Sequence, residues 1–301
     1  MLEYKKYSLG GKMKYNASLA YLFSPKILNS FFELNENSNQ LQNIIQELGL
    51  HKFISNNTTF RELFENTYIQ LLKNYRNEYV FKNAIAQKIL IGRHSIKSSS
   101  LFTELRVETS KADIVIFNGT SHVYEIKTDL DNFERLEAQI ENYKKVFEYV
   151  NIVSVESKVE TIQSLVDNDI GIIILTDKYT LSTVRKAKSR LNKLDKQVLF
   201  NMLRKDEYLK IIKNIFGYIP DVPNTKIYSV SKELFITLSV KEAHKEVLKA
   251  LKTRKNHKNL IENIKKFPDS LKIAIIEADL NIQQQQIFLK ALNTRVKPSL
   301  T

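Results

Sequence analysis

Apolar residues recur at helical spacing in the first third of the chain. Between Thr59 and Ile91 they stand three or four positions apart, which is the period of a helix with one buried face. The members of this apolar stripe are Phe64, Tyr68, Leu71, Leu72, Tyr75, Tyr79, Ala86 and Ile89. Thr59 with Glu62 three residues later is typical of a capping box, and Gly92 is a helix stop. The pattern predicts one long helix over residues 59–91.

Short runs of β-branched residues replace the helical period after residue 100. Strands are predicted over Leu101–Glu108, Ala112–Phe117 and His122–Thr128. The segment Asn118-Gly119-Thr120 between the last two strands is a hairpin signal. The helical period then returns over Asn132–Tyr149. We therefore expect a helix, three strands and a second helix in that order.

Two further apolar runs, Asn151–Val155 and Ile170–Leu175, predict strands with a helix near Val159–Val166 between them. The order is then helix, three strands, helix, strand, helix, strand. Alternation of this kind favours an α/β fold with a mixed central sheet. The next stretch, Lys178–Lys210, is expected to be helical and basic, with ten Lys or Arg against three acids.

The length of 301 residues suggests about two domains. Residues 1–57 are predicted to form a loop-rich N-terminal segment with short helices. Residues 58–200 are predicted to form the α/β core, and residues 201–301 a helical C-terminal module. Pro220 and Pro223 mark a linker within the last part.

Composition narrows the class of partner. Lys and Arg total 46 against 33 Asp and Glu, so the formal net charge is +13, and the pI is near 9.5. This balance favours polyanionic partners, with nucleic acid first and an acidic membrane surface second. With 43% hydrophobic residues the chain can bury a sizeable core, which separates it from disordered basic tails.

Several kinds of site are excluded. The chain has no Cys, which rules out disulfides, thiolate zinc sites and cysteine nucleophiles. The seven Gly form neither a phosphate-binding loop nor a Gly-x-Gly-x-x-Gly fingerprint, and the five His include no i,i+4 pair. The longest clean apolar run, near Ile170–Leu175, is far too short to cross a bilayer, and the polar N-terminus lacks a signal-peptide core. We therefore expect a cytoplasmic protein without a membrane partner.

The candidate chemistry is concentrated in the predicted hairpin, with Asp113 on one strand and Glu125 and Lys127 on the other. Glu125 and Lys127 share a face because side chains alternate along a strand. A two-residue turn at Asn118-Gly119 would offset Asp113 from Glu125 by one position. A three-residue loop, Asn118–Thr120, would place them directly opposite, with Cβ atoms about 4.5–5.5 Å apart.

Two carboxylates at that separation repel each other unless a cation lies between them or one is protonated. Mg²⁺ or Mn²⁺, which prefer oxygen ligands, would satisfy both. Lys127 could then orient a water nucleophile or offset the negative charge of a phosphate. An acid pair, a divalent metal and a lysine on a basic protein point to phosphodiester hydrolysis. The alternative is a cross-strand ion pair on a solvated sheet face.

Asp113, followed after a hairpin by Glu125-x-Lys127, resembles the core of the PD-(D/E)XK nuclease superfamily, although Ala112 replaces the family proline. The resemblance implies an αβββαβ restriction-endonuclease-like core, here with helical N- and C-terminal additions. It also implies metal-dependent cleavage of nucleic acid.

Gln139-x-x-x-Tyr143 matches an element of the RecB-like branch of this superfamily. Residues four apart share a helix face, so both side chains would point at the site. The segment Tyr-Glu-Ile-Lys-Thr-Asp-Leu-Asp, residues 124–131, is similar to a poorly characterised bacterial family within the superfamily. Its last acids, Asp129 and Asp131, are expected to cap the following helix, the alternative being a metal or water-positioning role.

The superfamily also places a Glu on the helix before the sheet as a third metal ligand. Glu62, Glu65 and Glu78 are the candidates here. Glu78 is preferred because it stands three positions after Tyr75 and borders the apolar stripe, where a carboxylate needs a partner such as a metal. Glu104 on the first strand is the alternative.

The basic run after the predicted core is expected to contact phosphates, the alternative being a solvated helix face. The residues chosen for this contact are Arg185, Lys186, Lys188 and Arg190. This run would lie beside the site and bind the substrate backbone.

The sequence therefore predicts a Mg²⁺- or Mn²⁺-dependent nuclease acting on DNA, with RNA as the other substrate in question. The catalytic residues are expected to be Asp113, Glu125, Lys127, Gln139 and Tyr143. The metal ligands are expected to be Glu78, Asp113 and Glu125. Two other classes stay open: a catalytically silent nuclease-fold protein that binds nucleic acid, and a homodimer or protein-interaction partner in a mobile-element or antiviral system.

Overall fold

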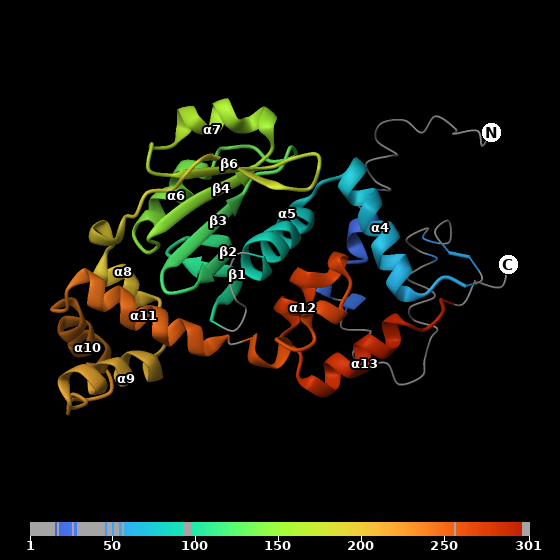
Figure 1. The fold of residues 1–301 in the computed structure, drawn as a ribbon. Coiled ribbons are helices and arrows are strands. Elements are labelled where there is room, and N and C mark those ends of the chain that lie inside the picture. The colour runs from blue at the N-terminus through green and yellow to red at the C-terminus, as the bar shows by residue number, and fades with distance from the viewer. Residues whose placement is uncertain are drawn as a thin grey trace. The chain divides into compact units, whose positions relative to one another are not determined.

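The computed structural model describes residues 57–92, 98–255 and 257–296, with residues 16, 18–25, 27, 28, 46, 50, 54 and 55. The chain divides into two compact units (Figure 1). The first unit comprises residues 1–87 and 257–301, and the second comprises residues 88–256. Most of the predicted N-terminal segment, residues 1–57, lies outside the described residues.

The predicted long helix over residues 59–91 is wrong, because the chain leaves the helical path at Tyr75. The first part is α4 (Phe60–Asn74), which begins with the expected capping box between Thr59 and Glu62. Tyr75 has a φ of −158°, and Asn77 accepts a hydrogen bond from the Val80 backbone as the N-cap of α5 (Glu78–Ile85). A new cap of this kind starts a second helix. A π-helical turn, η2 (Ala86–Ile91), follows and ends just before Gly92.

Residues from the far end of the chain complete the first unit. They form α12 (Lys272–Ala278), α13 (Ile282–Leu292) and three short 3₁₀ turns. The turns are η5 (His257–Leu260), η6 (Ile264–Lys266) and η7 (Asp269–Leu271). The Glu65 carboxylate accepts hydrogen bonds from the backbone and hydroxyl of Ser270, and Asn83 binds the backbones of Asp269 and Ile273. The predicted domain boundaries after residues 57 and 200 do not coincide with this division.

Within the second unit the described strands form one six-stranded mixed sheet in the order β1 to β6, which confirms the α/β class. The strands are β1 (Ser100–Val107), β2 (Ser110–Phe117), β3 (Ser121–Ile126), β4 (Tyr149–Ser154), β5 (Gly171–Leu175) and β6 (Leu181–Arg185). β1, β2 and β3 pair antiparallel, β3, β4 and β5 pair parallel, and β6 pairs antiparallel with β5.

The parallel strands give the sheet two distinct edges. β3, β4 and β5 all end at one edge, at Ile126, Ser154 and Leu175, which we call the carboxyl edge. They begin at the opposite edge, at Ser121, Tyr149 and Gly171, which we call the amino edge. Antiparallel β2 begins at the carboxyl edge, because its last residue pairs with the first residue of β3. Side chains at the start of β2 and the end of β3 therefore lie at the same edge.

The helix after β3 is shorter than the predicted Asn132–Tyr149. It is α6 (Leu136–Lys144), and no side chain caps its first turn. The chain before it is held in a turn after β3, and the chain after it leaves the helix at Lys145 to enter β4. Tyr143 of α6 and Phe147 after it are fully buried in the same core as Phe117. After β4 come the 3₁₀ turn η3 (Glu156–Lys158) and α7 (Val159–Leu165).

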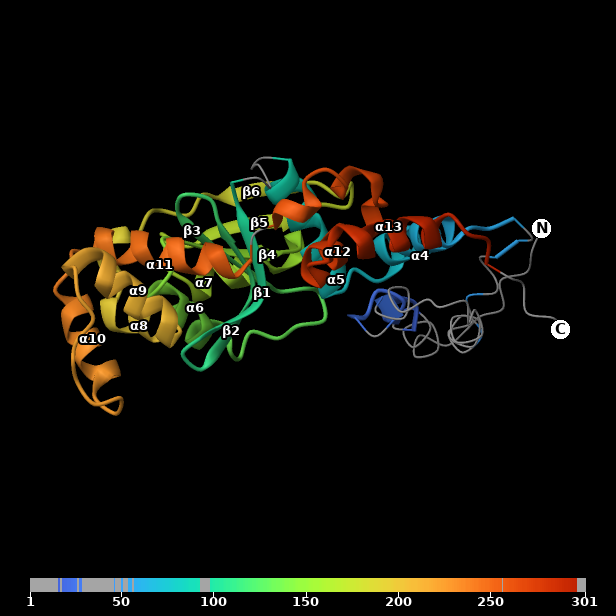
Figure 2. The same ribbon diagram turned by 90° about the horizontal axis from the view of Figure 1, so that it is seen from below.

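The predicted helical character of the chain just after β5 is wrong, because residues 181–185 form β6. The β-branched Thr183 pairs with Ile173 of β5. Helices begin only later, with η4 (Leu191–Lys193), α8 (Lys196–Asn201), α9 (Lys205–Phe216), α10 (Ile227–Ile236) and α11 (Val240–Arg254). Their buried residues, among them Leu199 and Phe235, join the core of the sheet, so these helices belong to the second unit (Figure 2). None of the described helices has the length and apolar character that a membrane crossing requires.

His244 of α11 makes the stability of the second unit sensitive to pH. Its ring is 5% exposed, and Nε2 lies 2.8 Å from Ser121 Oγ. Burial lowers the pKa of His244 below its ordinary value of about 6.5, although the Glu148 carboxylate opposes the shift. The unfolded chain therefore binds the proton more readily, and stability is lost as the pH falls below that ordinary value.

We expect the wild-type chain to lose more stability than His244→Gln between about pH 7.5 and about pH 5.5, in urea unfolding followed by circular dichroism. Gln retains a polar group to face Ser121 and does not titrate. Equal losses in the two proteins would contradict this role of His244.

Candidate active site

The β2–β3 hairpin resolves the two registers left open by the sequence. Phe117 pairs with Ser121 and Ile114 with Tyr124, so the loop is the three residues Asn118–Thr120. Gly119 has a φ of 101°, in the left-handed region that glycine adopts without a steric cost. This register puts Asp113 opposite Glu125.

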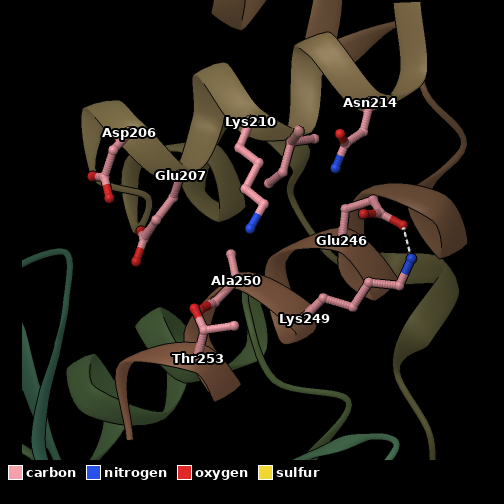
Figure 3. A pocket seen from close by; sticks show the side chains of 9 residues that line it. Asp206, Glu207, Lys210, Asn214, Glu246, Lys249, Ala250 and Thr253 are labelled. Atoms are coloured by element: carbon pink, nitrogen blue, oxygen red, sulfur yellow. Dashed lines mark hydrogen bonds and ion pairs between the residues drawn. The ribbon is translucent and has the colours of Figure 1, made fainter.

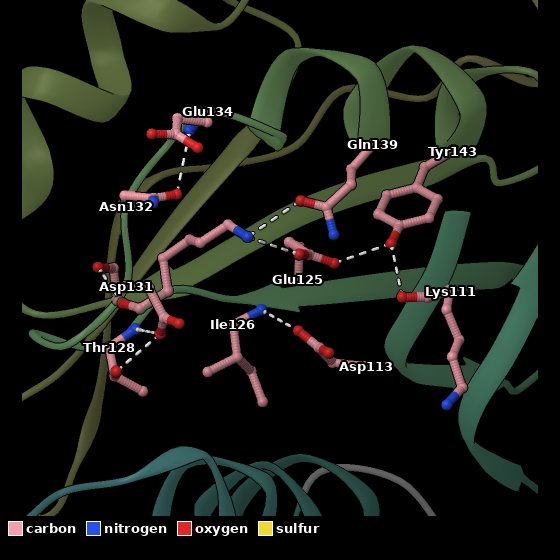
Figure 4. Close-up of polar contacts among 12 residues, drawn as sticks. Lys111, Asp113, Glu125, Ile126, Thr128, Asp131, Asn132, Glu134, Gln139 and Tyr143 are labelled. Atoms are coloured by element: carbon pink, nitrogen blue, oxygen red, sulfur yellow. Dashed lines mark hydrogen bonds and ion pairs between the residues drawn. The ribbon is translucent and has the colours of Figure 1, made fainter. Parts of the chain in front are cut away.

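Glu125 and Lys127 form a buried ion pair at the end of β3. Their exposed fractions are 1% and 9%, and Lys127 Nζ lies 3.0 Å from Glu125 Oε1. Gln139 Oε1 also accepts a hydrogen bond from Lys127 Nζ at 3.0 Å (Figure 4). A buried charge needs such partners. The ammonium is therefore held between a carboxylate and an amide rather than solvated.

Tyr143 contacts the same carboxylate from one helical turn further along α6. Its hydroxyl lies 2.9 Å from Glu125 Oε2 and 3.0 Å from the Lys111 carbonyl oxygen (Figure 4). Gln139 and Tyr143, four residues apart, therefore both face β3, as the spacing predicted. Burial, followed by the nearby Glu125 carboxylate, raises the pKa of Tyr143 far above its ordinary value, so the phenol keeps its proton.

The ionisation of Glu125 is set by two opposing influences. Burial raises the pKa of its carboxyl group, and the Lys127 ammonium together with hydrogen bonds from Tyr143 and Gln139 lowers it. The net pKa is raised above the ordinary value. The carboxylate thus depends on the positive charge beside it, which a lysine or a divalent cation can supply.

Asp113 is oriented by the backbone of the facing strand. Its Oδ2 accepts a hydrogen bond of 2.7 Å from the Ile126 N–H (Figure 4). The last backbone pair of the β2–β3 ladder toward this edge is Ile114 with Tyr124. Beyond that pair, the Asp113 side chain replaces a backbone oxygen as the acceptor for the Ile126 N–H. Its half-buried carboxylate is thereby held at the carboxyl edge.

A turn after β3 supports Lys127, and the sequence did not reveal it. Asp131 Oδ2 accepts hydrogen bonds from Thr128 N at 2.8 Å and from Thr128 Oγ1 at 2.7 Å. Ser154 Oγ donates to the Lys127 carbonyl oxygen at 2.5 Å. A Thr three residues before a carboxylate is the spacing at which an acidic side chain reaches back to the Thr backbone N–H, and it was the available signal. Asp131 therefore closes this turn, and its predicted role as a helix cap is wrong.

Asp129 does not cap the helix either. Its Oδ1 accepts a hydrogen bond from Ser157 Oγ at 3.3 Å, and the first turn of α6 has no side-chain cap. The acids after β3 thus fasten the loop at the carboxyl edge instead of the helix.

The candidates for a third metal ligand fall in different units. Glu62 caps α4 and Glu65 binds Ser270, so both carboxylates have structural partners in the first unit. Glu78, also in the first unit, has Oε1 2.6 Å from Lys82 Nζ, and its role as a ligand stays a prediction.

The alternative ligand, Glu104 of β1, lies in the second unit with Asp113. The β1–β2 register pairs Thr103 with Ile114 and so puts Glu104 opposite Asp113. Carboxylate oxygens of the two residues lie within 4.8 Å, and Lys111 Nζ lies 2.6 Å from Glu104 Oε2. Glu104 also has a φ of 57°, which is uncommon for a residue other than glycine.

The donor set at the carboxyl edge fits a hard divalent cation. Carboxylate oxygens of Asp113 and Glu104 lie within 4.8 Å of each other, and Glu125 stands opposite Asp113 on β3. Mg²⁺ and Mn²⁺ select oxygen ligands of this kind, and each carboxylate oxygen that already accepts one hydrogen bond retains a second lone pair. The raised pKa of Glu125 adds a reason for a cation beside it.

The basic run does not lie beside this site. Arg185 pairs with Ile172 at the start of β5, which places the run at the amino edge. β3 alone extends about 17 Å between the two edges. The Arg185 guanidinium donates to the backbone oxygens of Ile170 and Asp167, and Arg190 forms an ion pair with Asp169. The predicted position beside the site is therefore wrong.

The two lysines of the run, Lys186 and Lys188, are exposed at the amino edge. Their contact with nucleic acid stays a prediction. The charge of the run alone did not reveal that its two arginines form hydrogen bonds and an ion pair within the protein.

A groove between α9 and α11 has a volume of 310 Å³ and is lined by charged side chains of both signs (Figure 3). They include Asp206, Lys210, Glu246 and Lys249, and Lys249 Nζ lies 2.5 Å from Glu246 Oε1. None of the predicted site residues lines this groove. Its mixed charge does not favour a polyanion.

The chain is similar to a bacteriophage protein. Protein cII of Enterobacteria phage P4 is 32% identical to it over 112 residues, which cover 36% of this chain and 41% of that protein. The chain thus spans about two-fifths of the length of this relative. Among solved structures, a protein of unknown function from Silicibacter pomeroyi covers 36% of this chain and 68% of its own length at 17% identity, with a TM-score of 0.28.

The family described as bacteriophage P4 protein cII matches residues 71–281, a range that includes every predicted site residue. The chain therefore belongs to the bacteriophage P4 protein cII family.

Proposed function

We propose that the second unit is a metal-dependent nuclease of the PD-(D/E)XK type that hydrolyses phosphodiester bonds in DNA. The observation that supports this proposal is the convergence of five polar side chains at the carboxyl edge. Four of them, Glu125, Lys127, Gln139 and Tyr143, are joined by hydrogen bonds. The fifth, Asp113, stands opposite Glu125 and is bound by the Ile126 N–H. An ion pair on a solvated face would not need the burial and the shared hydrogen bonds seen here.

Asp113 and Glu125 would hold Mg²⁺ or Mn²⁺, with Glu104 of the same unit as the third ligand. When bound, such an ion polarises a phosphoryl oxygen and lowers the pKa of a coordinated water. The proposal places this chemistry in the cytoplasm.

The remaining residues would orient the reacting groups. Lys127 would donate hydrogen bonds to a phosphate oxygen or to the attacking water, because its ammonium is fixed by Glu125 and Gln139. Tyr143, which keeps its proton, would hold Glu125 in one rotamer by its hydrogen bond to Oε2. Both are the supports that a preorganised site requires.

A second candidate is a catalytically silent protein of the same fold that binds nucleic acid. It is favoured by the fact that Lys127 and Tyr143 between them contact both oxygens of Glu125. The chain thus compensates its own buried carboxylate. Calorimetry with Mn²⁺ separates the two candidates, because the silent protein would bind no metal and still bind DNA in a salt-dependent manner.

The decisive assay is hydrolysis of labelled linear and circular DNA with Mg²⁺, with Mn²⁺ and with a chelator. We expect cleavage that needs the metal and a loss of at least about 100-fold in Asp113→Asn, because the amide lacks the negative charge a divalent cation prefers. Asp167→Asn is the matched control, since Asp167 is exposed next to the amino edge. Full cleavage by Asp113→Asn, or cleavage in chelator, would reject the proposal.

A further inference from the structure

The β5–β6 hairpin lies at the same sheet edge as the candidate active site. β5 runs parallel to β3 and ends at Leu175, and Leu175 pairs with Leu181 at the start of β6. The loop between them therefore projects from the carboxyl edge (Figure 1). Two strand spacings, about 10 Å, separate β3 from β5. We call this loop, residues Asp177–Tyr179, the β5–β6 tip.

The β5–β6 tip holds an aromatic residue in a conformation that glycine usually takes. Thr176 N donates to Thr180 O at 2.9 Å, and Tyr179 N donates to Thr176 O at 3.0 Å. Tyr179 has a φ of 57°, the left-handed position of a three-residue hairpin loop. The β2–β3 loop has the same length and also has positive φ, but there Gly119 is the residue concerned. A bulky residue at such a φ is an outlier and suggests a use for its ring.

The chemistry of the β5–β6 tip suits a nucleic-acid strand. Lys178 is exposed at this tip. Lys88 Nζ lies 5.4 Å from the centre of the half-buried Tyr179 ring, which adds a second cation beside the aromatic face. Ammonium groups that follow a phosphate backbone and an aromatic ring that stacks on a base are the two components of single-strand binding.

We infer that the β5–β6 tip binds the substrate strand, with Lys178 on a backbone phosphate and Tyr179 against a base. The inference rests on the proposed nuclease function for the position of the reacting phosphate near Lys127. The strand would then span the separation of about 10 Å between β3 and β5 to reach the tip from the reacting phosphate. The exposed lysines at the amino edge, Lys186 and Lys188, then lie outside this strand's path.

The test measures binding of the full chain to a labelled DNA duplex with a single-stranded end, in chelator and at several salt concentrations. We expect Lys178→Gln to lower the slope of log K against log salt by about one, because one phosphate contact is lost. Lys213→Gln, which removes an exposed lysine from α9, is the matched control and should keep the wild-type slope. A wild-type slope in Lys178→Gln would overturn the inference.

Two variants test the ring. Tyr179→Phe should bind like wild type, and Tyr179→Asn should bind at least about fivefold more weakly, since one stacking contact is lost. Asn tolerates the left-handed conformation, so the loop is kept. Wild-type affinity in Tyr179→Asn would overturn the role of Tyr179.

The binding assay contains no metal, so it is independent of catalysis. Salt-dependent binding through Lys178 without any cleavage would reject the nuclease proposal and leave the strand contact in place. Cleavage without a change of slope in Lys178→Gln would reject the strand contact alone.

Discussion

Lys127→Met is expected to reduce metal-dependent DNA cleavage by about 100- to 1000-fold while divalent-metal binding persists. The ammonium lies 3.0 Å from both Glu125 Oε1 and Gln139 Oε1, so it has one fixed place at the carboxyl edge. Negative charge that develops on a phosphate there would be stabilised without a reorganisation of the site. Methionine keeps a long apolar side chain and removes the charge. The initial rate at saturating Mg²⁺ measures the effect.

The control for this variant is Lys213→Met, which removes an exposed lysine from α9 and should keep the wild-type rate. Calorimetry with Mn²⁺ and circular dichroism verify that Lys127→Met still binds metal and is still folded. A wild-type rate in a folded, metal-binding Lys127→Met protein would show that the ammonium has no part in hydrolysis.

The same substitution should also have the largest effect on stability, because it leaves Glu125 buried without its cation. Removing one partner of a buried ion pair costs about 3–5 kcal/mol. Glu125 is 1% exposed, and burial already raises the pKa of its carboxyl group. A folded-state pKa above the unfolded value means that stability is present at low pH and is lost as the pH rises through the folded-state pKa. The deficit of Lys127→Met should therefore grow from acidic toward neutral pH.

Glu125→Gln should restore most of the stability that Lys127→Met loses. The neutral amide needs no cation, and its oxygen can accept the hydrogen bond that Tyr143 now donates to Glu125 Oε2 at 2.9 Å. Urea unfolding of the two single variants and the double variant gives the coupling free energy as a double-mutant cycle. Additive effects in that cycle, or a deficit of Lys127→Met that does not change with pH, would contradict a buried charge pair.

Added Mg²⁺ provides a further reading of the same experiment. A cation held by the carboxylates would replace the missing ammonium, so Mg²⁺ should stabilise Lys127→Met more than the wild-type chain. Equal stabilisation of the two proteins by Mg²⁺ would show that the Glu125 carboxylate is not a metal ligand.

Local sequence patterns predicted most of the strands, because a short strand depends mainly on the types and spacing of the residues within it. β-branched runs located β1 to β5, and the capping box located the start of α4. The break at Tyr75–Asn77 was missed, because the apolar stripe continues through it while the Asn77 side chain starts a new helix. β6 was missed because its Lys- and Arg-rich surroundings resemble a solvated helix, while pairing with β5 makes it a strand.

The candidate site was predictable to the extent that it depends on alternation and helical phase. The alternation of side chains places Glu125 and Lys127 on one face, and the spacing of four residues places Gln139 and Tyr143 on one face of α6. The choice between two hairpin registers required the structure, because Gly119 is compatible with both a two-residue and a three-residue loop. The supports from Thr128, Asp131 and Ser154 come from separate segments and have no common pattern.

By itself, the sequence determined the α/β class, the basic balance and the carboxylate–lysine set on two adjacent strands, because these depend on residue type and short-range spacing. Only the tertiary structure decided which edge of the sheet each loop occupies. Parallel pairing of β3, β4 and β5 brings Lys127 and the β5–β6 tip to one edge, and antiparallel β6 carries Arg185 and its neighbours to the other. The sequence gives the number of basic residues, but strand pairing determines at which edge of the sheet they lie.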